Sequence, residues 1–211
     1  TVINVIAYVI LPIPIRGGYT FGGWWTGGGG MGTQVTDATI VTASADHTLY
    51  AKWRPVAYTV KFDANGGTVA PSNKVVIFDA PYGELPEPLQ TGYAFQGWRT
   101  ATNGVVFGVE SNSVVSIPEN HRLTAALAAN TYIVTFDPNG GTVDPTNKAV
   151  TFDAIYGEMP VPERAGHTFG GWYLAAGGAG MQVTDTTIVA AVSDHTLYAK
   201  WSAKSVKVTF N

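Results

Sequence analysis

Residues 58–69 read YTVKFDANGGTV, and residues 132–143 repeat the pattern as YIVTFDPNGGTV. The same spacing of 74 residues separates Trp24 from Trp98 and Trp98 from Trp172. A constant spacing without gaps indicates one small folding unit copied in tandem, an organisation typical of spacers, stalks and filaments rather than of catalysts.

The 211 residues contain two complete copies of this unit and parts of two others. The complete copies are residues 58–131 and 132–205. Residues 1–57 correspond to an incomplete copy that lacks its first strand, and residues 206–211 correspond to the first strand of a next copy. Each complete copy is large enough to bury a modest hydrophobic core.

Composition excludes several classes of protein. Charged residues make up 13% of the chain and the net charge is −3, so the sequence predicts neither nucleic acid nor an anionic membrane as a partner. No cysteine is present to form a disulfide or a thiolate metal site. The longest apolar run, residues 5–15, is too short to span a bilayer, so no membrane insertion is expected. The chain starts at Thr1, which indicates a processed protein or a fragment.

Alternating side chains predict the first strand of each copy. Tyr58, Val60 and Phe62 alternate with polar residues, which is the period of a strand with one buried face. The Asn-Gly-Gly step at residues 65–67 supplies residues able to adopt positive φ, as a tight turn requires. The sequence therefore predicts a mainly β unit that begins with a hairpin-like return.

The rest of a unit is expected to contain three more strands. A Pro-x-Pro connector follows the second strand, because fixed φ angles favour an extended crossing. A glycine-rich hairpin tip follows the third strand, and residues 37–45 and 185–193 leave room for one short helix. The three strands are expected at residues 74–78 and 148–152, at 93–98 and 167–172, and at 46–53 and 194–201.

The last strand of the middle copy indicates which side chains face inward. It reads HRLTAAL where the other two copies read HTLYAKW. Leu123, Ala125 and Leu127 stay apolar, whereas Tyr and Lys of the other copies become Thr124 and Ala126. Because the changes fall on one side of a period-two pattern, the apolar positions are expected to face the core.

These motifs resemble the Listeria-Bacteroides repeat, the internalin-B-type B repeat of long surface proteins in bacteria and some archaea. The motifs are VKFDANGGTV, YGELPEP, GYAFQGW and DHTLYAKW, and the resemblance covers nearly the whole chain. It implies a compact β-grasp-like module in an extended tandem array. It also implies stalk and spacer roles, sometimes with adhesion or polyanion binding, although this chain lacks the basic charge that polyanion binding needs. The first copy departs from the pattern, because Asn4 replaces the strand phenylalanine.

Histidines and acids at repeated positions are expected to be structural. His47, His121 and His195 lie in different copies, so we expect them far apart, each as a turn residue that opens the last strand. Asp63 and Asp137 lie beside turns, where a carboxylate caps backbone N–H groups. We therefore expect no catalytic residue, no metal site and no cofactor, and the chain is not expected to be an enzyme.

Five of the six tryptophans recur in register, and we expect them in the cores that a cysteine-free module needs. Trp25 is the exception, because Arg99 and Tyr173 stand at the equivalent positions. We expect Trp25 to be exposed, and Trp25 and Tyr173 are candidate contacts for a surface glycan or another partner.

The two ends suggest a mode of assembly. The first copy lacks its opening strand, which leaves a sheet edge uncovered next to the very apolar residues 1–15. The tail has the pattern of the missing strand, so one hypothesis is that it completes the first unit of the next molecule and builds an open filament. The alternative is a window of a longer array, in which neighbouring copies continue covalently. The candidate assembly residues are Val2, Ile3, Val5, Ile6, Val206, Val208 and Phe210.

Together these observations predict a structural repeat protein, located outside the cell or on its surface. It would be a stalk or filament segment whose modules pack end to end. Its expected partners are copies of itself or adjoining repeats of a longer chain. The alternative is an adhesion or carbohydrate-binding module that uses exposed aromatic side chains to bind surface glycans.

Overall fold

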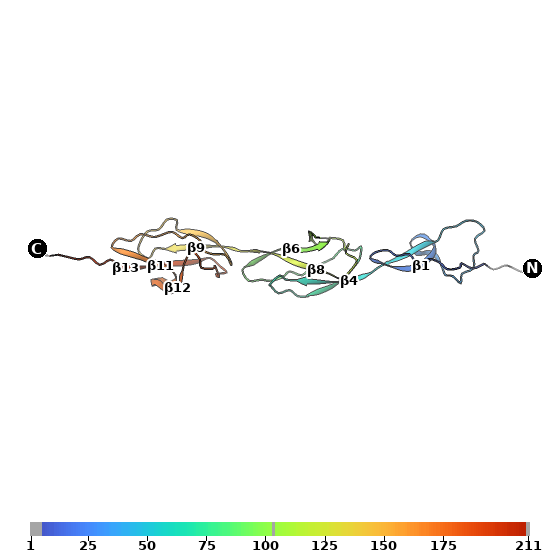
Figure 1. Cartoon of the computed structure of the whole chain (residues 1–211), viewed down its shortest axis with the longest axis horizontal. Coiled ribbons are helices and arrows are strands. Elements are labelled where there is room, and N and C mark those ends of the chain that lie inside the picture. Colours follow the sequence, from blue (N-terminus) through green and yellow to red (C-terminus); the bar gives the residue numbers. More distant parts are fainter. Residues whose placement is uncertain (1–5, 103, 210–211) are drawn as a thin grey trace, which may run out of the picture. The chain divides into compact units, whose positions relative to one another are not determined.

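Three β-sheets follow one another along the chain in the computed structural model, which describes residues 6–102 and 104–209 (Figure 1). The described residues are mainly β, as predicted, and their only helical segments are two 3₁₀ turns, η1 (Gly28–Gly30) and η2 (Ala176–Gly178). The chain divides into two compact units. One joins the residues up to Pro88 with Gly97–Ala126, and the other joins Leu89–Gln96 with the residues from Leu127 onward.

The first sheet has three antiparallel strands in the order β2-β1-β3. The turn η1 joins β1 to β2, so these strands form the hairpin that the glycine-rich sequence predicts. The strands are β1 (Tyr19–Gly27), β2 (Met31–Val35) and β3 (Tyr50–Pro55).

The second and third sheets have five strands each and share one topology, β5-β4-β8-β6-β7 and β10-β9-β13-β11-β12. In both, the first strand of a copy lies parallel to the last one. The pairs β4–β5, β6–β7, β9–β10, β11–β12 and β11–β13 are antiparallel. Any similarity of the module to the β-grasp fold beyond this strand order stays a prediction. The strands are β4 (Ala57–Asp63), β5 (Asn73–Ile77), β6 (Tyr93–Thr102), β7 (Val105–Val109), β8 (His121–Ala129), β9 (Thr131–Asp137), β10 (Asn147–Thr151), β11 (His167–Ala175), β12 (Ala179–Val183) and β13 (His195–Ala203).

The core of the third sheet lies on the face that alternation predicts. Val134 and Phe136 of β9 are buried, and so are Leu197 and Ala199 of β13. Trp172 of β11 is 2% exposed, and its ring centroid lies 4.9 Å from that of Phe136. Leu123 and Ala125 are buried in the same way in the second sheet, so the inward assignment of the last strand is confirmed for these positions.

The indole of the core tryptophan also holds the Pro-x-Pro connector. Trp172 Nε1 donates a hydrogen bond of 2.9 Å to the carbonyl of Pro160, and Trp98 Nε1 donates one of 2.8 Å to the carbonyl of Pro86. A connector without a ladder leaves carbonyl groups that need donors. The tryptophan therefore links the connector to the sheet in both complete copies.

The Asn-Gly-Gly turn forms as predicted, and the aspartate before it caps the turn. Asp137 Oδ1 accepts a hydrogen bond of 2.8 Å from the backbone N–H of Asn139, whose φ is +47°. Asn139 Nδ2 also donates to the carbonyl of Ala199 across the sheet, at 3.2 Å. The turn is thus fixed from both sides by short polar side chains.

A β-bulge explains the Phe-x-Gly-Trp motif. In a regular strand, Phe169 and Trp172 would point to opposite faces, because they are three residues apart. The register of β11 against β13 shifts between these two residues, and Gly171 adopts a φ of +110°. As a result the two rings pack together at 5.4 Å between centroids.

The prediction of a short helix in residues 37–45 and 185–193 is wrong, because neither range forms a helix. Residues 185–193 form a turn that pairs with the segment before the connector, through the bridge between Ile155 and Ile188 and a hydrogen bond of 2.8 Å from the N–H of Val189 to the carbonyl of Ala154. Thr187 Oγ1 accepts a bond from the N–H of Thr184. β-Branched residues and side-chain-to-backbone bonds of this kind favour turns over helix.

Candidate interaction surfaces

Aromatic side chains gather where the first sheet meets the second, inside the first compact unit. The ring of Tyr19, at the start of β1, lies 5.3 Å from that of Phe78, and its hydroxyl donates a hydrogen bond to the carboxylate of Asp79. The N–H of Phe78 donates to the carbonyl of Val56, and the N–H of Val56 donates to the carbonyl of Gly18, both at 2.9 Å. We call Tyr19, Phe78 and Asp79 the first latch.

The second latch has the same construction and lies inside the second compact unit. The ring of Tyr93 lies 5.6 Å from that of Phe152, and its hydroxyl donates a 3.0 Å hydrogen bond to Asp153 Oδ2. The N–H of Phe152 donates to the carbonyl of Asn130, and the N–H of Asn130 donates to that of Gly92, again at 2.9 Å. The same contacts therefore recur at two positions 74 residues apart.

Each latch tyrosine is coupled to its aspartate. The hydrogen bond to the carboxylate of Asp79 raises the pKa of Tyr19 above its ordinary value, and the bond to Asp153 raises that of Tyr93. The shift follows because the phenol donates a proton to the bond and ionisation would place two negative charges side by side. The phenols of both latches thus stay neutral over the physiological pH range.

Trp25 and Tyr173 are half-buried, so the expected exposure of Trp25 is wrong. The ammonium group of Lys52 lies 4.6 Å from the ring centroid of Trp25, and that of Lys200 lies 4.9 Å from the ring of Tyr173. Trp25 Nε1 donates to the carbonyl of Gly22. Lysine side chains therefore cover part of the aromatic surface that a glycan would use, through cation–π contacts.

The repeated histidines contact tyrosines of their own copies. His121 and His195 open β8 and β13, as predicted, and their Nε2 atoms lie 2.6 Å from the hydroxyls of Tyr82 and Tyr156. His47 pairs with Tyr8 in the first copy. Burial raises the pKa of Tyr82 and of Tyr156. The three imidazoles thus serve three separate Tyr–His pairs.

Acidic side chains in the described ranges 6–102 and 104–209 form no metal-binding group with each other or with histidine. Asp63 instead contacts Arg122 at 2.8 Å, and its pKa is lowered, first by the hydrogen bond from the N–H of Asn65 and then by Arg122. This ion pair is largely exposed, so it contributes little to stability.

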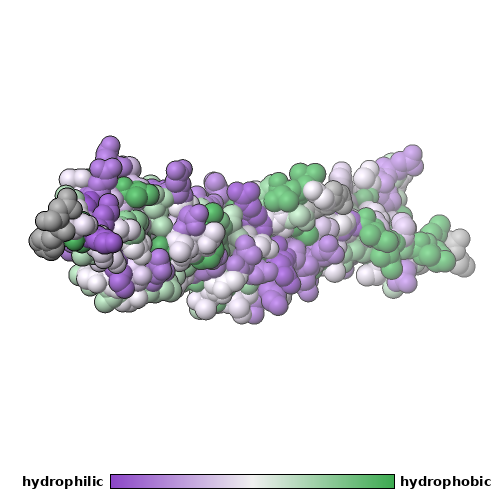
Figure 2. Space-filling view, turned by 60° about the vertical axis from the view of Figure 1, so that its left-hand side comes forward, coloured by the Kyte–Doolittle hydropathy of each residue, from purple (hydrophilic) through white to green (hydrophobic). Residues whose placement is uncertain are grey.

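The candidate assembly residues lie partly outside the described residues, which exclude Val2, Ile3, Val5 and Phe210. Val206 and Val208 are exposed, and so is Ile6, whose carbonyl accepts a hydrogen bond from the N–H of Val41. More exposed apolar side chains follow Ile6 along the chain. These side chains are Val9, Ile10, Ile13 and Ile15. Figure 2 shows hydrophobic surface, in green, at the faint end of the molecule.

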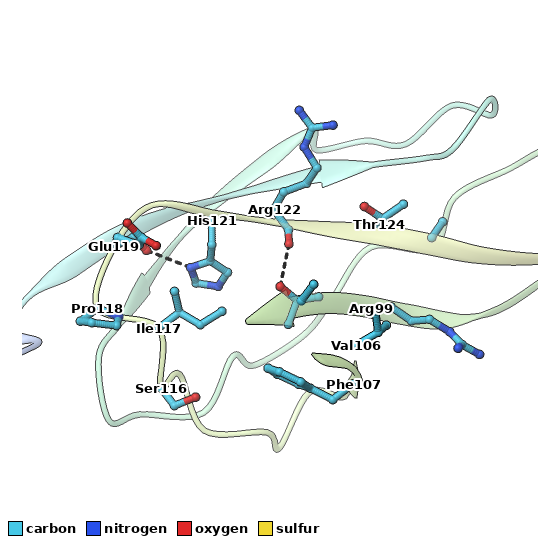
Figure 3. Close-up of a pocket in the computed structure, with 13 residues that line it drawn as sticks. Arg99, Val106, Phe107, Ser116, Ile117, Pro118, Glu119, His121, Arg122 and Thr124 are labelled. Atoms are coloured by element: carbon cyan, nitrogen blue, oxygen red, sulfur yellow. Dashed lines mark hydrogen bonds between the residues drawn. The ribbon is translucent and has the colours of Figure 1, made fainter. Parts of the chain in front are cut away.

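The middle copy has a surface hollow that sequence reasoning missed. It has a volume of about 770 Å³ and an apolar floor that includes Val106, Phe107 and Ile117. Figure 3 shows the guanidinium groups of Arg99 and Arg122 at its rim, both pointing away from this floor.

The hollow lies where the other copies carry a cross-strand aromatic pair. Trp25 stands opposite Tyr50 in the first copy, and Tyr173 stands opposite Tyr198 in the third. The middle copy has Arg99 and Thr124 at the equivalent positions. The change from Tyr to Thr124 was the signal in the sequence, because it removes a ring from this face.

The sequence matches the Listeria-Bacteroides repeat domain over residues 5–52, 58–126 and 132–200. The chain belongs to the Listeria-Bacteroides repeat family. Each of the three matches contains the strands of one sheet or most of them, so the family's repeat corresponds to one sheet of the structure.

Listeria-Bacteroides repeats of this kind occur in much longer proteins. The chain is 32% identical over 93% of its length to a "Putative Gly-rich membrane protein" of Evansella cellulosilytica, and 36% identical over 77% to a "Putative membrane protein" of the same organism. It is 30% identical over 69% of its length to Internalin H of Listeria monocytogenes. The chain spans 22%, 24% and 25% of these three relatives, respectively.

None of the helical segments in the described part of this repeat protein has the length and apolar composition needed to cross a membrane.

Proposed function

We propose that this chain is a non-catalytic structural segment of a cell-surface protein, in which Listeria-Bacteroides repeats are joined end to end as a stalk or spacer. The observation that carries the proposal is the recurrence of the latch. Tyr19 with Phe78 and Tyr93 with Phe152 repeat the same ring contact and the same tyrosine–aspartate hydrogen bond. A contact that recurs at each junction supports a function in setting the spacing between copies.

The use of the aromatic side chains supports a structural role. Trp98 and Trp172 are buried in their sheets, and the phenylalanines of the latches lie against tyrosines. Burying a phenylalanine side chain contributes on the order of 1.5–3 kcal/mol. A protein without cysteine gains its cohesion from such contacts.

The location at the cell surface rests on the relatives. Two are named as membrane proteins and one as an internalin, and the chain covers about a quarter of each. A segment of this size within a longer surface protein is well suited to hold another domain away from the cell.

A distance measurement tests the spacer role. The chain has no cysteine, so Ser44→Cys and Ser193→Cys, both at exposed positions, allow two spin labels to be attached selectively. We expect a narrow distribution of distances in the parent chain, which becomes broad in Phe78→Ala and in Phe152→Ala. Val75→Ala, at an exposed position of β5, is the control that leaves the distribution unchanged. A broad distribution in the parent chain would contradict the spacer role.

Strand donation is a second mode of assembly that one observation favours. In the second and third sheets, β4 and β9 lie parallel to β8 and β13. Within the described residues, β3 of the first sheet has no such neighbour. The tail with Val206 and Val208 has the sequence pattern of the first strand of a copy, which is the strand that would lie parallel to β3. Both of these side chains are exposed. We expect concentration-dependent association that Val208→Lys abolishes, whereas sedimentation as a monomer at high concentration excludes donation.

Glycan adhesion is the alternative function, and the structure offers three places to test, one in each copy. The rings of Trp25 and Tyr173 are partly covered by lysines, whereas Phe107 in the hollow of the middle copy is 39% exposed. Saturable changes in tryptophan fluorescence on adding glycans, lost in Trp25→Ala or in Phe107→Ala, would support adhesion.

A further inference from the structure

Three glycine–aromatic pairs occupy equivalent positions in the three copies: Gly18 with Tyr19, Gly92 with Tyr93, and Gly166 with His167. All three glycines have positive φ, of +77°, +80° and +70°. A Cβ atom on Gly18 would overlap the ring of Phe78, and one on Gly92 would overlap the ring of Phe152. At Gly166 no heavy atom of the described residues lies within 4 Å of that position. Two of the positions are therefore filled by a phenylalanine and the third is open.

The backbone around the open position already has the geometry of the filled ones. The N–H of Lys204 donates a 2.9 Å hydrogen bond to the carbonyl of Gly166, as Val56 does to Gly18 and Asn130 does to Gly92. In both filled latches the carbonyl of the donating residue then accepts a bond from the phenylalanine N–H. The carbonyl of Lys204 is the equivalent acceptor at the third position.

Aromatic side chains border the open position as they border the first latch. The ring of His167 lies 6.5 Å from that of Trp201 with an interplanar angle of 77°, and the ring of Tyr19 lies 6.5 Å from that of Trp53 at 69°. His167 Nδ1 lies 2.9 Å from the carbonyl of Ala165. A hollow of about 720 Å³ is lined by His167, Trp201 and Lys204, among others. The third copy thus presents the receiving half of a latch.

We propose that Gly166, His167, Trp201 and Lys204 form a docking socket for the Phe-Asp turn of a further Listeria-Bacteroides repeat, carried later in the same polypeptide. The inference rests on the proposed spacer function and adds the contact that would join the third copy to the repeat after it. The phenylalanine ring packs over Gly166 and against His167, and its N–H donates to the carbonyl of Lys204. Because His167 Nδ1 already donates to the carbonyl of Ala165, the aspartate accepts its hydrogen bond from the Nε2–H of the doubly protonated imidazole. His167 takes the position that Tyr19 and Tyr93 have in the filled latches.

The chain itself shows which occupant fits. Both filled sockets contain a Phe-Asp step from the copy that follows in sequence, and the aspartates have φ values of +64° and +62°. A second molecule of this chain would present Asn4-Val5 at the equivalent position of its first copy, which offers neither ring nor carboxylate. The socket therefore selects a repeat with the complete Phe-Asp step.

Lengthening the chain tests the socket. A second copy of residues 132–211 is placed after Ser205, so that a Phe-Asp step follows Phe152 at the repeat spacing. Hydrogen exchange then measures the amide of the added phenylalanine, which is expected to be protected like the amide of Phe152. Gly166→Ala is expected to speed exchange of that amide by about tenfold or more, because the new methyl group overlaps the docked ring.

Matched variants separate docking from unfolding. Gly92→Ala is expected to speed exchange at Phe152 by a similar factor. Gly166→Ala in the chain of 211 residues is expected to affect Phe152 no more than the core amides of the same copy, because the strain at positive φ acts on the copy as a whole. Amides of the core strands in the added copy must stay protected in all variants, which shows that the copy is folded.

Two results would overturn the socket. One is a folded added copy whose phenylalanine amide exchanges freely or ignores Gly166→Ala. The other is an added copy that does not fold, because an identical sequence joined to a fitting socket should fold as residues 132–205 do. Either result leaves the spacer proposal intact if the distribution of distances between labels at positions 44 and 193 stays narrow. Failure of the socket and failure of the spacer function are therefore distinguishable.

Discussion

The inner and outer faces of the two complete copies differ in how much they vary. Most buried positions carry the same residue in both copies, with Ala64, Thr100 and Ile117 as exceptions, whereas the outer positions of the same strands change in size and charge. The shared buried pairs include Val60 with Val134, Phe62 with Phe136, Trp98 with Trp172, Leu123 with Leu197, and Ala125 with Ala199. The changed outer pairs are Arg99 with Tyr173, Arg122 with Thr196, Thr124 with Tyr198, and Ala126 with Lys200.

This difference shows that the fold depends on the inner face of each sheet, whereas side chains on the outer face can vary. Core packing is close to that of a crystal, so a changed volume there is costly. On the outer face the change from Tyr198 to Thr124 removes a ring and leaves the sheet order unaltered. Outer positions are therefore where one copy acquires a property that the others lack.

The largest effect is expected from the inner face. Trp172→Ala removes a buried ring and its hydrogen bond to Pro160, and we expect a loss of about 3–5 kcal/mol in the free energy of unfolding. The neighbouring Tyr173→Ala changes the outer face and is expected to cost about 1 kcal/mol or less. Urea denaturation followed by circular dichroism measures both. Equal losses would break the distinction between the faces.

The glycines of the filled and open sockets give the next largest effect. Gly92→Ala and Gly166→Ala both place alanine at positive φ, at a cost of about 1–2 kcal/mol each. Gly92→Ala also forces the methyl group against Phe152, which adds about 1–3 kcal/mol. Thermal unfolding should therefore show the larger loss for Gly92→Ala, and the reverse order would contradict the packing of the second latch.

Alkaline pH probes the buried tyrosines. Burial raises the pKa of Tyr156 in the folded protein, so its contribution to stability is complete below the unfolded value of about 10 and is lost as the pH rises through the folded pKa. Tyr156→Phe removes this contribution together with the hydrogen bond to His195, at a cost of about 0.5–1.5 kcal/mol at neutral pH.

Tyr82 has the same environment in the second copy, so the double variant Tyr82→Phe with Tyr156→Phe is the informative one. Denaturation is measured at several pH values between neutrality and strong alkali. The free energy of unfolding should fall less steeply with rising pH in the double variant than in the parent chain. An unchanged slope would mean that other groups cause the alkaline loss.

The smallest effect is expected from filling the hollow of the middle copy. Thr124→Tyr restores the ring that the other copies have, and we expect a stability change of about 0.2–1 kcal/mol in the favourable direction. Thr100 keeps its hydrogen bond to the carbonyl of Arg122, which serves as a local NMR marker of an intact sheet. A clear loss of stability would show that the outer face is less tolerant than proposed.

Much of the fold could be predicted from local patterns. Alternation gave the first strand and the inward side of the last one, because each signal lies within a few residues of Phe62 or Leu123. The Asn139 turn was predictable for the same reason, since its φ and its aspartate cap depend on neighbours in sequence. The short helix was wrong because the groups that hold residues 185–193 come from around Ala154, which local propensity ignores.

The interaction surfaces were harder to predict, because they depend on contacts between distant residues. The latch joins Tyr93 to Phe152 and Asp153, and no local pattern relates them. The motif around Gly171 was recognised, but its bulge follows from the register against β13. The exposure of Trp25 was misjudged because the covering side chain, Lys52, lies on another strand.

The parallel pairing of β9 and β13 has a mechanical consequence. The polypeptide enters the third copy along β9 and leaves along β13, and these strands lie side by side from Val134 opposite His195 to Asp137 opposite Tyr198. Tension applied to the two ends of the copy therefore loads this ladder in shear, so its hydrogen bonds resist together instead of opening one after another. In the proposed stalk, tension would therefore extend the chain without unfolding its copies, and pulling single molecules would show a high rupture force for each complete copy.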